Sequence, residues 1–289
     1  MHKLAITVSV VYIDNLVARN WLLSSSPLAP TEHFNALPEE AKKRALSGGL
    51  GVNLLHSGLS FAVPLWWLFE SQQKNLQLRN GSAFLADFGQ GIFAITAAHV
   101  FTEYLEAKKR TGAIGCQLGN ALFEPEARLI SCRSDLDIAT FQVSLAEAGL
   151  INTPTVKPDP PGWEPLIPAV TNFAFFAGFP AQTRGMTSEG NFVTAPYFAM
   201  PPITSVTDRQ ITCRFDREKM IDFSGSGLPP PGYDIGGVSG GPMLMPTLVD
   251  GGVVWRFAGV IIEAAAGTLF EQVVAVRAHY IQPDGRMGH

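Results

Sequence analysis

Cysteine is scarce in this 289-residue chain, which has only Cys116, Cys132 and Cys213. An odd number without paired spacing argues against a disulfide framework and is typical of a reducing compartment. We therefore expect a cytoplasmic protein. A single Cys116–Cys132 bridge is the alternative that these three residues allow.

Long hydrophobic runs, blocks of one charge and metal-ligand spacings are missing as well. No run reaches the length of a membrane span, so none is predicted. The formal net charge is -4 with 16% charged residues, and the longest basic cluster is short. This argues against a nucleic-acid surface. The six histidines show no metal-ligand spacing, so we expect neither a metal nor another cofactor.

The first 18 residues leave an alternative for localisation. Leu4–Ile13 is mostly apolar and follows Lys3, as in a signal peptide, which would make the protein secreted or periplasmic. However, the charged region is thin and Asp14 follows the apolar run at once. A strand or an ordered N-terminal extension is the other interpretation.

What the chain does contain points to many short strands. Hydrophobic residues make up 46%, with 28 glycines and 21 prolines, a composition typical of a globular protein rich in turns. The prolines of Asn152–Pro168 block both helix and central strand, so this segment is predicted to be a linker. Strand signals on both sides of it predict an all-β fold of two antiparallel units.

The strand signals are spaced regularly along both units. An edge strand is expected at Leu59–Phe69, because Pro64 cannot donate to a central ladder. A short helix is expected from Pro38 to Gly48-Gly49, and another after Arg277. The other expected strands are 81–87, 92–96, 118–130, 138–143, 172–177, 191–198, 210–215, 243–245, 253–262 and 272–276.

This pattern gives three predicted parts. Residues 1–57 form a partly helical N-terminal extension, residues 58–160 the first β unit, and residues 161–289 the second. No visible chemistry lies in the extension.

One glycine-rich stretch, Gly236–Pro242, carries the strongest chemical signal. Glycines on both sides of Ser239 allow a tight turn that exposes its hydroxyl and aims the N–H groups of Gly237 and Ser239 at one spot. A nucleophile beside two such donors is what acyl transfer needs. Taken alone, the stretch is equally compatible with a plain glycine-rich loop.

A base and an orienting acid are available earlier in the chain. His99 follows the small residues Thr96-Ala97-Ala98 at the end of an expected strand, and Asp137 opens another. Both precede the linker and Ser239 follows it, so the site is expected in the cleft between the two units. Asp135 is the alternative orienter.

Together these residues resemble the trypsin-like, chymotrypsin-fold serine peptidases, of the disulfide-free bacterial kind. The resemblance covers roughly residues 58–285, and its three motifs occur in the order His, Asp, Ser. The matching segments are Gly81-Ser82-Ala83-Phe84-Leu85, Thr96-Ala97-Ala98-His99, Asp137-Ile138-Ala139, Gly178-Phe179-Pro180 and Gly237-Val238-Ser239-Gly240-Gly241-Pro242.

The resemblance implies two antiparallel six-stranded β-barrels and a serine endopeptidase acting on a protein or peptide. Ser239 would form the acyl-enzyme, His99 would be general base and acid, and Asp137 would orient the imidazole. The N–H groups of Gly237 and Ser239 would form the oxyanion hole.

The resemblance also implies which residues line the substrate site. They are Tyr233 and Asp234 before the nucleophile, and Ile262, Glu263 and Ala264 after it. Asp234 could select a basic side chain, or it could be a turn residue. The backbone of 262–264 would pair with an extended substrate as an added strand.

Two departures from the family pattern matter. Val238 stands where many animal relatives have the aspartate that receives a newly cleaved N-terminus. We therefore expect no activation of that type, and an oxyanion loop ordered by packing alone. Val100 stands where secreted relatives have a half-cystine.

Two other functions remain open. A catalytically silent protease fold could serve as a binding module. An esterase of the α/β-hydrolase type could use Asp250 and His279, but Pro242 and Pro246 argue against the helix that this fold needs after the serine. A regulator would be a separate protein or residues 1–57 themselves.

Overall fold

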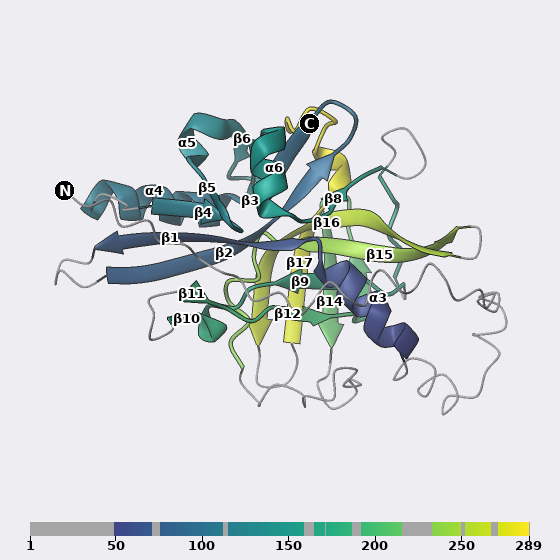
Figure 1. Ribbon diagram of the computed structural model, residues 1–289. Helices are drawn as coiled ribbons and strands as arrows, with labels where there is room; N and C mark the ends of the chain where they lie inside the picture. Colours follow the sequence, from purple (N-terminus) through teal and green to yellow (C-terminus); the bar gives the residue numbers. More distant parts are fainter. Residues whose placement is uncertain are drawn as a thin grey trace.

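Two antiparallel sheets hold most of the strands, and they lie side by side in the molecule (Figure 1). The chain is seen here in a computed structural model. The described residues are 49–70, 76–111, 115–158, 165–170, 172–186, 192–215, 233–249, 252–266 and 271–288.

The first sheet has eight strands in the order β5-β4-β1-β2-β3-β7-β6, with β8 paired parallel to β2. Its strands are β1 (Ala62–Glu70), β2 (Leu76–Asp87), β3 (Ile92–Ala97), β4 (Gly115–Leu118), β5 (Ala121–Leu122), β6 (Leu129–Arg133), β7 (Ile138–Gln142) and β8 (Thr155–Val156).

The second sheet has seven strands in the order β12-β9-β15-β16-β17-β14-β13, and β10 and β11 form a separate pair. These strands are β9 (Phe175–Gly178), β10 (Gly185–Met186), β11 (Phe192–Val193), β12 (Tyr197–Ala199), β13 (Ile203–Val206), β14 (Gln210–Phe215), β15 (Pro242–Val249), β16 (Gly252–Ala266) and β17 (Glu271–Arg277).

In the part of the chain that the structure describes, helices are few and lie outside the sheets (Figure 1). The helix α3 lies against β9 and β12 of the second sheet. None of the helices in the described part of the chain is long and apolar enough to cross a membrane. The helices are α3 (Gly49–Leu59), α4 (Ala98–Thr111), α5 (Pro125–Arg128) and α6 (Leu145–Ile151), with single 3-10 turns η2 (Ala181–Thr183) and η4 (Ala278–Tyr280).

Three clusters of buried apolar side chains form the core. One lies within the first sheet around Leu85 and Phe141, and one within the second around Phe176 and Ile261. The third joins the two sheets, and its rings include Phe84 and Phe257, whose centroids are 5.2 Å apart. Since apolar burial is the main driving force for folding, this third cluster fixes one sheet against the other.

The chain is mostly β, and its two antiparallel sheets are consistent with the expected two-barrel chymotrypsin-like fold. The strand count differs from the prediction of six each, since the described residues form sheets of eight and seven strands. The chain end also returns to the first sheet, where Thr140 Oγ1 donates to Gly285 O over 2.6 Å.

Four local expectations need correction. The strand β1 is central, between β4 and β2, and Pro64 is tolerated because the β4 ladder covers only Leu65–Leu68. The predicted linker contains a strand, β8. A helix of 14 residues, α4, follows β3 directly and was not expected. Gly49 lies within the helix α3, where a helix was expected to end; the rest of that expected helix, residues 38–48, lies outside the described residues.

Candidate active site

His99 is placed by the junction between a strand and a helix. The strand β3 ends at Ala97 and α4 begins at Ala98. The register between β3 and β7 sets Ala97 opposite Ile138, so the residue before Ile138 lies beside the first turn of the helix. That residue is Asp137.

Asp137 meets this helix start with both its backbone and its side chain. Its carbonyl accepts from Ala98 N at 3.1 Å, and its Oδ1 accepts from His99 N at 2.8 Å. Two N–H groups that an α-helix leaves unpaired at its start are thereby satisfied. Asp137 has a φ of 55°, a left-handed conformation that aspartate adopts more readily than most residues.

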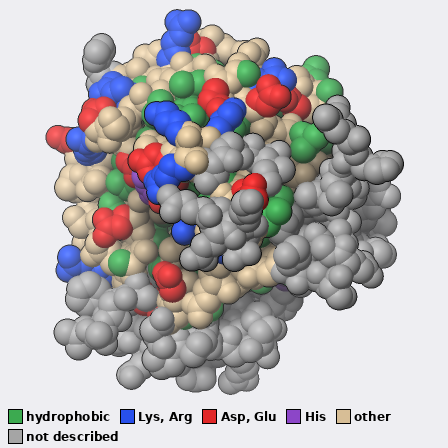
Figure 2. Space-filling model, turned by 90° about the vertical axis from the view of Figure 1, so that its left-hand side faces the viewer, with side chains coloured by type: hydrophobic (Ala, Val, Ile, Leu, Met, Phe, Trp, Pro, Cys, Tyr) green, Lys and Arg blue, Asp and Glu red, His purple; other side chains and the backbone are tan. Residues whose placement is uncertain are grey.

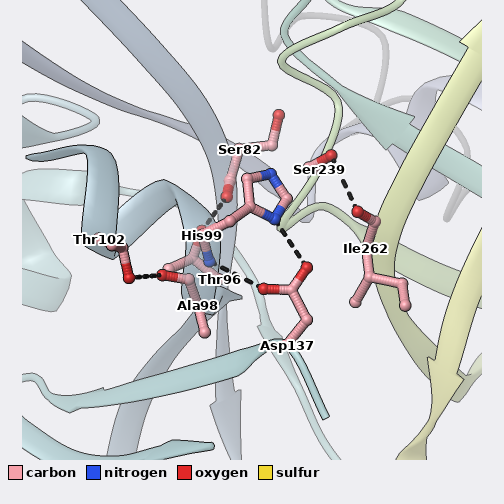
Figure 3. A network of polar contacts seen from close by, with 8 residues as sticks. All are labelled: Ser82, Thr96, Ala98, His99, Thr102, Asp137, Ser239 and Ile262. Atoms are coloured by element: carbon pink, nitrogen blue, oxygen red, sulfur yellow. Dashed lines mark hydrogen bonds and ion pairs between the residues drawn. The ribbon is translucent and has the colours of Figure 1, made fainter. Parts of the chain in front are cut away.

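The second carboxylate oxygen binds the imidazole (Figure 3). His99 Nδ1 lies 2.7 Å from Asp137 Oδ2. Because a carboxylate only accepts, Nδ1 carries the proton and Nε2 of the neutral ring is left as an acceptor. This hydrogen bond to Asp137 raises the pKa of His99 above its ordinary value, and partial burial opposes the rise.

Asp135 has a different partner. Its carboxylate forms two hydrogen bonds with Arg133, at 2.7 and 2.6 Å. The bonding to Arg133 lowers the pKa of Asp135 to about 2. Asp137, and not Asp135, therefore contacts the imidazole.

The turn around Ser239 needs its glycines because other backbone segments approach it closely. Gly240 has a φ of 91°, and a Cβ atom there would overlap Ser82 O and Thr96 Oγ1. A Cβ atom at Gly241 would overlap Ala177 O. The turn thus lies directly on strands of both sheets, and Ser239 is 8% exposed.

The hydroxyl of Ser239 lies near the imidazole but is turned to another acceptor (Figure 3). Ser239 Oγ donates to Ile262 O at 3.4 Å. Among the described residues, no hydrogen bond joins it to His99. Catalytic hydrogen bonds are often long or misaligned before substrate binds, and a change of the Ser239 rotamer would redirect the hydroxyl.

The loop before Ser239 forms a tight turn in which Val238 N donates to Ile235 O at 3.2 Å. Gly237 has a φ of 98°, which a type II turn requires at its third residue. Gly236 O accepts from Ala181 N at 2.7 Å and Val238 O from Gly241 N at 3.0 Å. In a trans peptide the N–H points opposite to the carbonyl.

The N–H groups of Gly237 and Ser239 therefore point away from the hydrogen bonds that Gly236 O and Val238 O accept. Neither has an acceptor among the described residues. The expectation that packing alone orders this loop is wrong, because Ser82 Oγ donates to Gly237 O at 2.7 Å. Packing contributes as well, since Val238 is fully buried.

Two of the expected substrate residues have structural partners. Asp234 Oδ1 accepts from Gly236 N at 2.7 Å, so Asp234 acts as a turn residue, the second of its two predicted roles. Tyr233 stacks on Tyr197 with ring centroids 5.8 Å apart. Burial raises the pKa of Tyr233.

The other three expected substrate residues, Ile262, Glu263 and Ala264, lie on a stretch of β16 that has no partner strand on the β15 side among the described residues. The ladder with β15 stops at Val260, and among the described strands none continues it. A register shift between Ile261 and Glu263 leaves Ile262 outside the pairing with β17. Such bulges re-aim backbone groups, and here the carbonyl of Ile262 faces Ser239. Glu263 is exposed and Ala264 is partly buried.

Other reactive groups lie apart from this site. All three cysteines are free, Cys116 and Cys213 buried and Cys132 exposed. In the described part of the chain, no three His, Cys, Asp or Glu side chains gather as metal ligands would.

Three residues at the site were not assigned a role from sequence. They are Ser82 and Asn80 on β2 and Thr96 on β3, and their hydroxyl or amide groups bond backbone near Ser239. Ser82 and Thr96 fall within motifs that resemble the peptidase family. The partners of Asn80 and Ser82 lie 99 and 155 residues away in sequence, so for Ser82 only the family motif could have drawn attention to it.

Comparison with known proteins adds one likeness. No family model and no curated protein sequence matches the chain. Among solved structures it is similar to Rv3671c from M. tuberculosis H37Rv, in an inactive serine-to-alanine mutant. The TM-score is 0.39 with 18% identity, over 80% of this chain and 89% of the other. A likeness this weak carries no argument about function.

Proposed function

We propose that the chain is a serine endopeptidase in which Ser239 is the nucleophile, His99 the general base and acid, and Asp137 the orienting group. The observation that carries this proposal is the 2.7 Å bond from His99 Nδ1 to Asp137 Oδ2, with the imidazole beside Ser239 (Figure 3). This bond leaves Nε2 as the nitrogen able to take a proton.

The chemistry proceeds in two halves. Ser239 Oγ attacks the peptide carbonyl carbon while its proton passes to His99 Nε2, and the carbonyl oxygen becomes an oxyanion. The N–H groups of Gly237 and Ser239 donate to that oxyanion. The imidazolium then protonates the leaving amine, the C–N bond breaks, and an acyl-enzyme remains on Ser239.

Water completes the cycle. His99 takes a proton from water, which attacks the ester carbonyl, and returns it to Ser239 Oγ as the acid leaves. Asp137 stays ionised throughout and stabilises each imidazolium.

A peptide is favoured over a small ester by the open side of β16. Backbone groups beyond Val260 have no strand beside them on the β15 side among the described residues. An extended peptide could add there as a strand, with its scissile carbonyl carried to Ser239. We infer that the backbone of 262–264 binds the substrate residues before the scissile bond.

One observation favours a silent binding module as the second candidate. The Ser239 hydroxyl donates to Ile262 O and not to His99. If that rotamer persisted with peptide bound, the protein would bind substrate without cleaving it.

Peptide cleavage separates the two candidates. Wild type and Ser239→Ala are incubated with a peptide library from a proteome digest, and new N-termini are read by mass spectrometry. The endopeptidase predicts new N-termini with wild type only. A matched control, Ser205→Ala, changes an exposed serine on β13 and should cleave as wild type does. Peptides bound but uncut by folded wild type would overturn the endopeptidase in favour of the silent module.

A further inference from the structure

Ser82 on β2 is fully buried, and all its polar atoms are bonded to other segments of the chain. Its N–H donates to Ser239 O at 3.0 Å, and its carbonyl accepts from Thr96 Oγ1 at 2.6 Å. Its hydroxyl lies 2.8 Å from Phe179 N and 2.7 Å from Gly237 O. One serine of the first sheet therefore contacts Ser239, the turn before it and the residue that follows β9 of the second sheet. Figure 3 shows Ser82 beside Thr96 and Ser239.

The direction of the hydroxyl bonds follows from the groups available. Phe179 N–H can only donate, so Ser82 Oγ accepts from it. A serine hydroxyl has a single proton, and the carbonyl of Gly237 is left to accept it. No freedom remains for the hydroxyl to rotate without leaving a buried group unpaired.

Phe179 is itself held by the same strand. Asn80 Nδ2 donates to Phe179 O at 2.6 Å, while Ser82 accepts from Phe179 N. Residues two apart on a strand share a face, so one face of β2 fixes both polar groups of Phe179. Two residues further on, Ala181 N donates to Gly236 O.

The loop before the nucleophile is thus anchored at two successive carbonyls, Gly236 O and Gly237 O, by bonds that lead back to β2. These anchors set the planes of the peptides that follow, and with them the direction of Gly237 N–H. The fit is close, since a Cβ atom at Gly178 would lie 2.6 Å from Ser82 Oγ and 2.7 Å from Val238 Cα.

We propose that Ser82 is the positioning residue of the oxyanion loop, defined here as residues 235–239, and holds the loop ready in the uncleaved chain. Its hydroxyl does not touch substrate but fixes the peptide between Gly237 and Val238, which lies between the two peptides that carry the N–H groups of Gly237 and Ser239. Ser82 has this role only if Ser239 is the nucleophile proposed above, so the inference rests on the proposed function.

The test compares Ser82→Ala with Thr140→Val. Thr140 is also a fully buried residue of the first sheet, and its hydroxyl donates to Gly285 O over 2.6 Å, away from the loop. Each change removes one buried hydroxyl together with its hydrogen bonds, those to Phe179 N and Gly237 O for Ser82 and that to Gly285 O for Thr140, so both should lower the unfolding midpoint. Only Ser82→Ala should slow phosphonylation by a fluorophosphonate and lower kcat for a peptide cleaved by wild type, each by roughly 10- to 100-fold. That is less than the 10²–10³-fold loss typical of deleting an oxyanion donor.

Two further readouts distinguish positioning from general damage. The imidazole resonances of His99 should titrate in Ser82→Ala as in wild type, because the Asp137 bond is untouched. The N–H groups of Val238 and Gly241 are bonded within the turn, and that of Gly240 donates to Ile261 O on β16. Hydrogen exchange at these three groups should be roughly tenfold faster in Ser82→Ala and unchanged in Thr140→Val.

Each outcome decides something. If Ser82→Ala keeps the wild-type phosphonylation rate and exchange while its midpoint falls like that of Thr140→Val, Ser82 is only structural. If folded wild type neither reacts nor cleaves, the proposed function fails. The exchange comparison then still shows whether Ser82 orders the loop, and unchanged exchange would overturn that role as well.

Discussion

His99 and Asp137 lie just beyond the paired ends of the neighbouring strands β3 and β7 of the first sheet, whereas Ser239 lies on a glycine turn that its own sheet does not hold alone. The contact between His99 and Asp137 follows from the register of β3 and β7. The turn depends on bonds from Ser82 and on tight contact with Thr96, both on strands of the other sheet. One pair of strands is enough to bring His99 and Asp137 together, but Ser239, the proposed nucleophile, is held in place only when both sheets are packed together.

This comparison leads to different expectations for the two regions. A change at His99 or Asp137 should alter the proposed catalysis and leave folding nearly intact, because both side chains are partly exposed. A change in the nucleophile turn should affect folding and catalysis together, because the turn is buried against both sheets.

The largest effect is expected from Asp137→Asn. The amide can donate to His99 and so favours the wrong tautomer, and turnover should fall by about 10⁴-fold. Peptide hydrolysis measures this loss, and the unfolding midpoint should change little. Asp135→Asn is the matched control, because Asp135 binds Arg133, and it should keep nearly full activity. Equal losses in the two variants would contradict the assignment of Asp137.

The next effect is expected from Gly240→Ala. The new methyl group would overlap Ser82 O and Thr96 Oγ1 at a backbone φ of 91°. We expect the free energy of unfolding to fall by about 2–4 kcal/mol, with activity lost in the remaining folded protein. Urea unfolding and active-site labelling measure the two effects.

Gly149→Ala serves as the control for that substitution. Gly149 lies in α6, and a Cβ atom there meets nothing within 4 Å. Alanine in a helix should be neutral or stabilise by up to about 1 kcal/mol. A loss at Gly149 as large as at Gly240 would show that the close approach to Ser82 is not the cause.

The smallest effect is expected from pH. The bond to Asp137 raises the pKa of His99 above its usual 6.5. As the pH falls, the imidazole is therefore protonated, and lost as a base, at a higher pH than a free histidine would be. The acid limb of kcat/KM should therefore have its midpoint above pH 6.5 and fall tenfold per unit below it. In Asp137→Asn the midpoint should move to lower pH. A wild-type midpoint well below 6.5 would contradict the observed pairing.

Sequence could predict those parts of the molecule whose signals are local. The strands β2 and β3 were predicted, at residues 81–87 and 92–96, from short local strand signals, and the family motifs singled out His99, Asp137 and Ser239. The helix α4 was missed although its last turn contains Lys108, Lys109 and Arg110, a pattern typical of a helix end.

Features that depend on distant partners could not be predicted in this way. The central position of β1 depends on β4, which pairs only beyond Pro64. The bulge at Ile262 is a mismatch in the pairing of β16 with β17, and neither strand's sequence contains a signal for it. The role of Ser82 requires knowing that β2 meets the turn 155 residues later.

The most direct test of the central claim is the reaction of purified protein with a fluorophosphonate, followed by peptide mapping of the adduct. The reagent reacts with an activated serine and resembles the tetrahedral intermediate. We predict one adduct, on Ser239, that is absent from Ser239→Ala and from His99→Ala but present in Ser205→Ala. Folded wild type without an adduct, or an adduct that survives His99→Ala at the wild-type rate, would contradict the account.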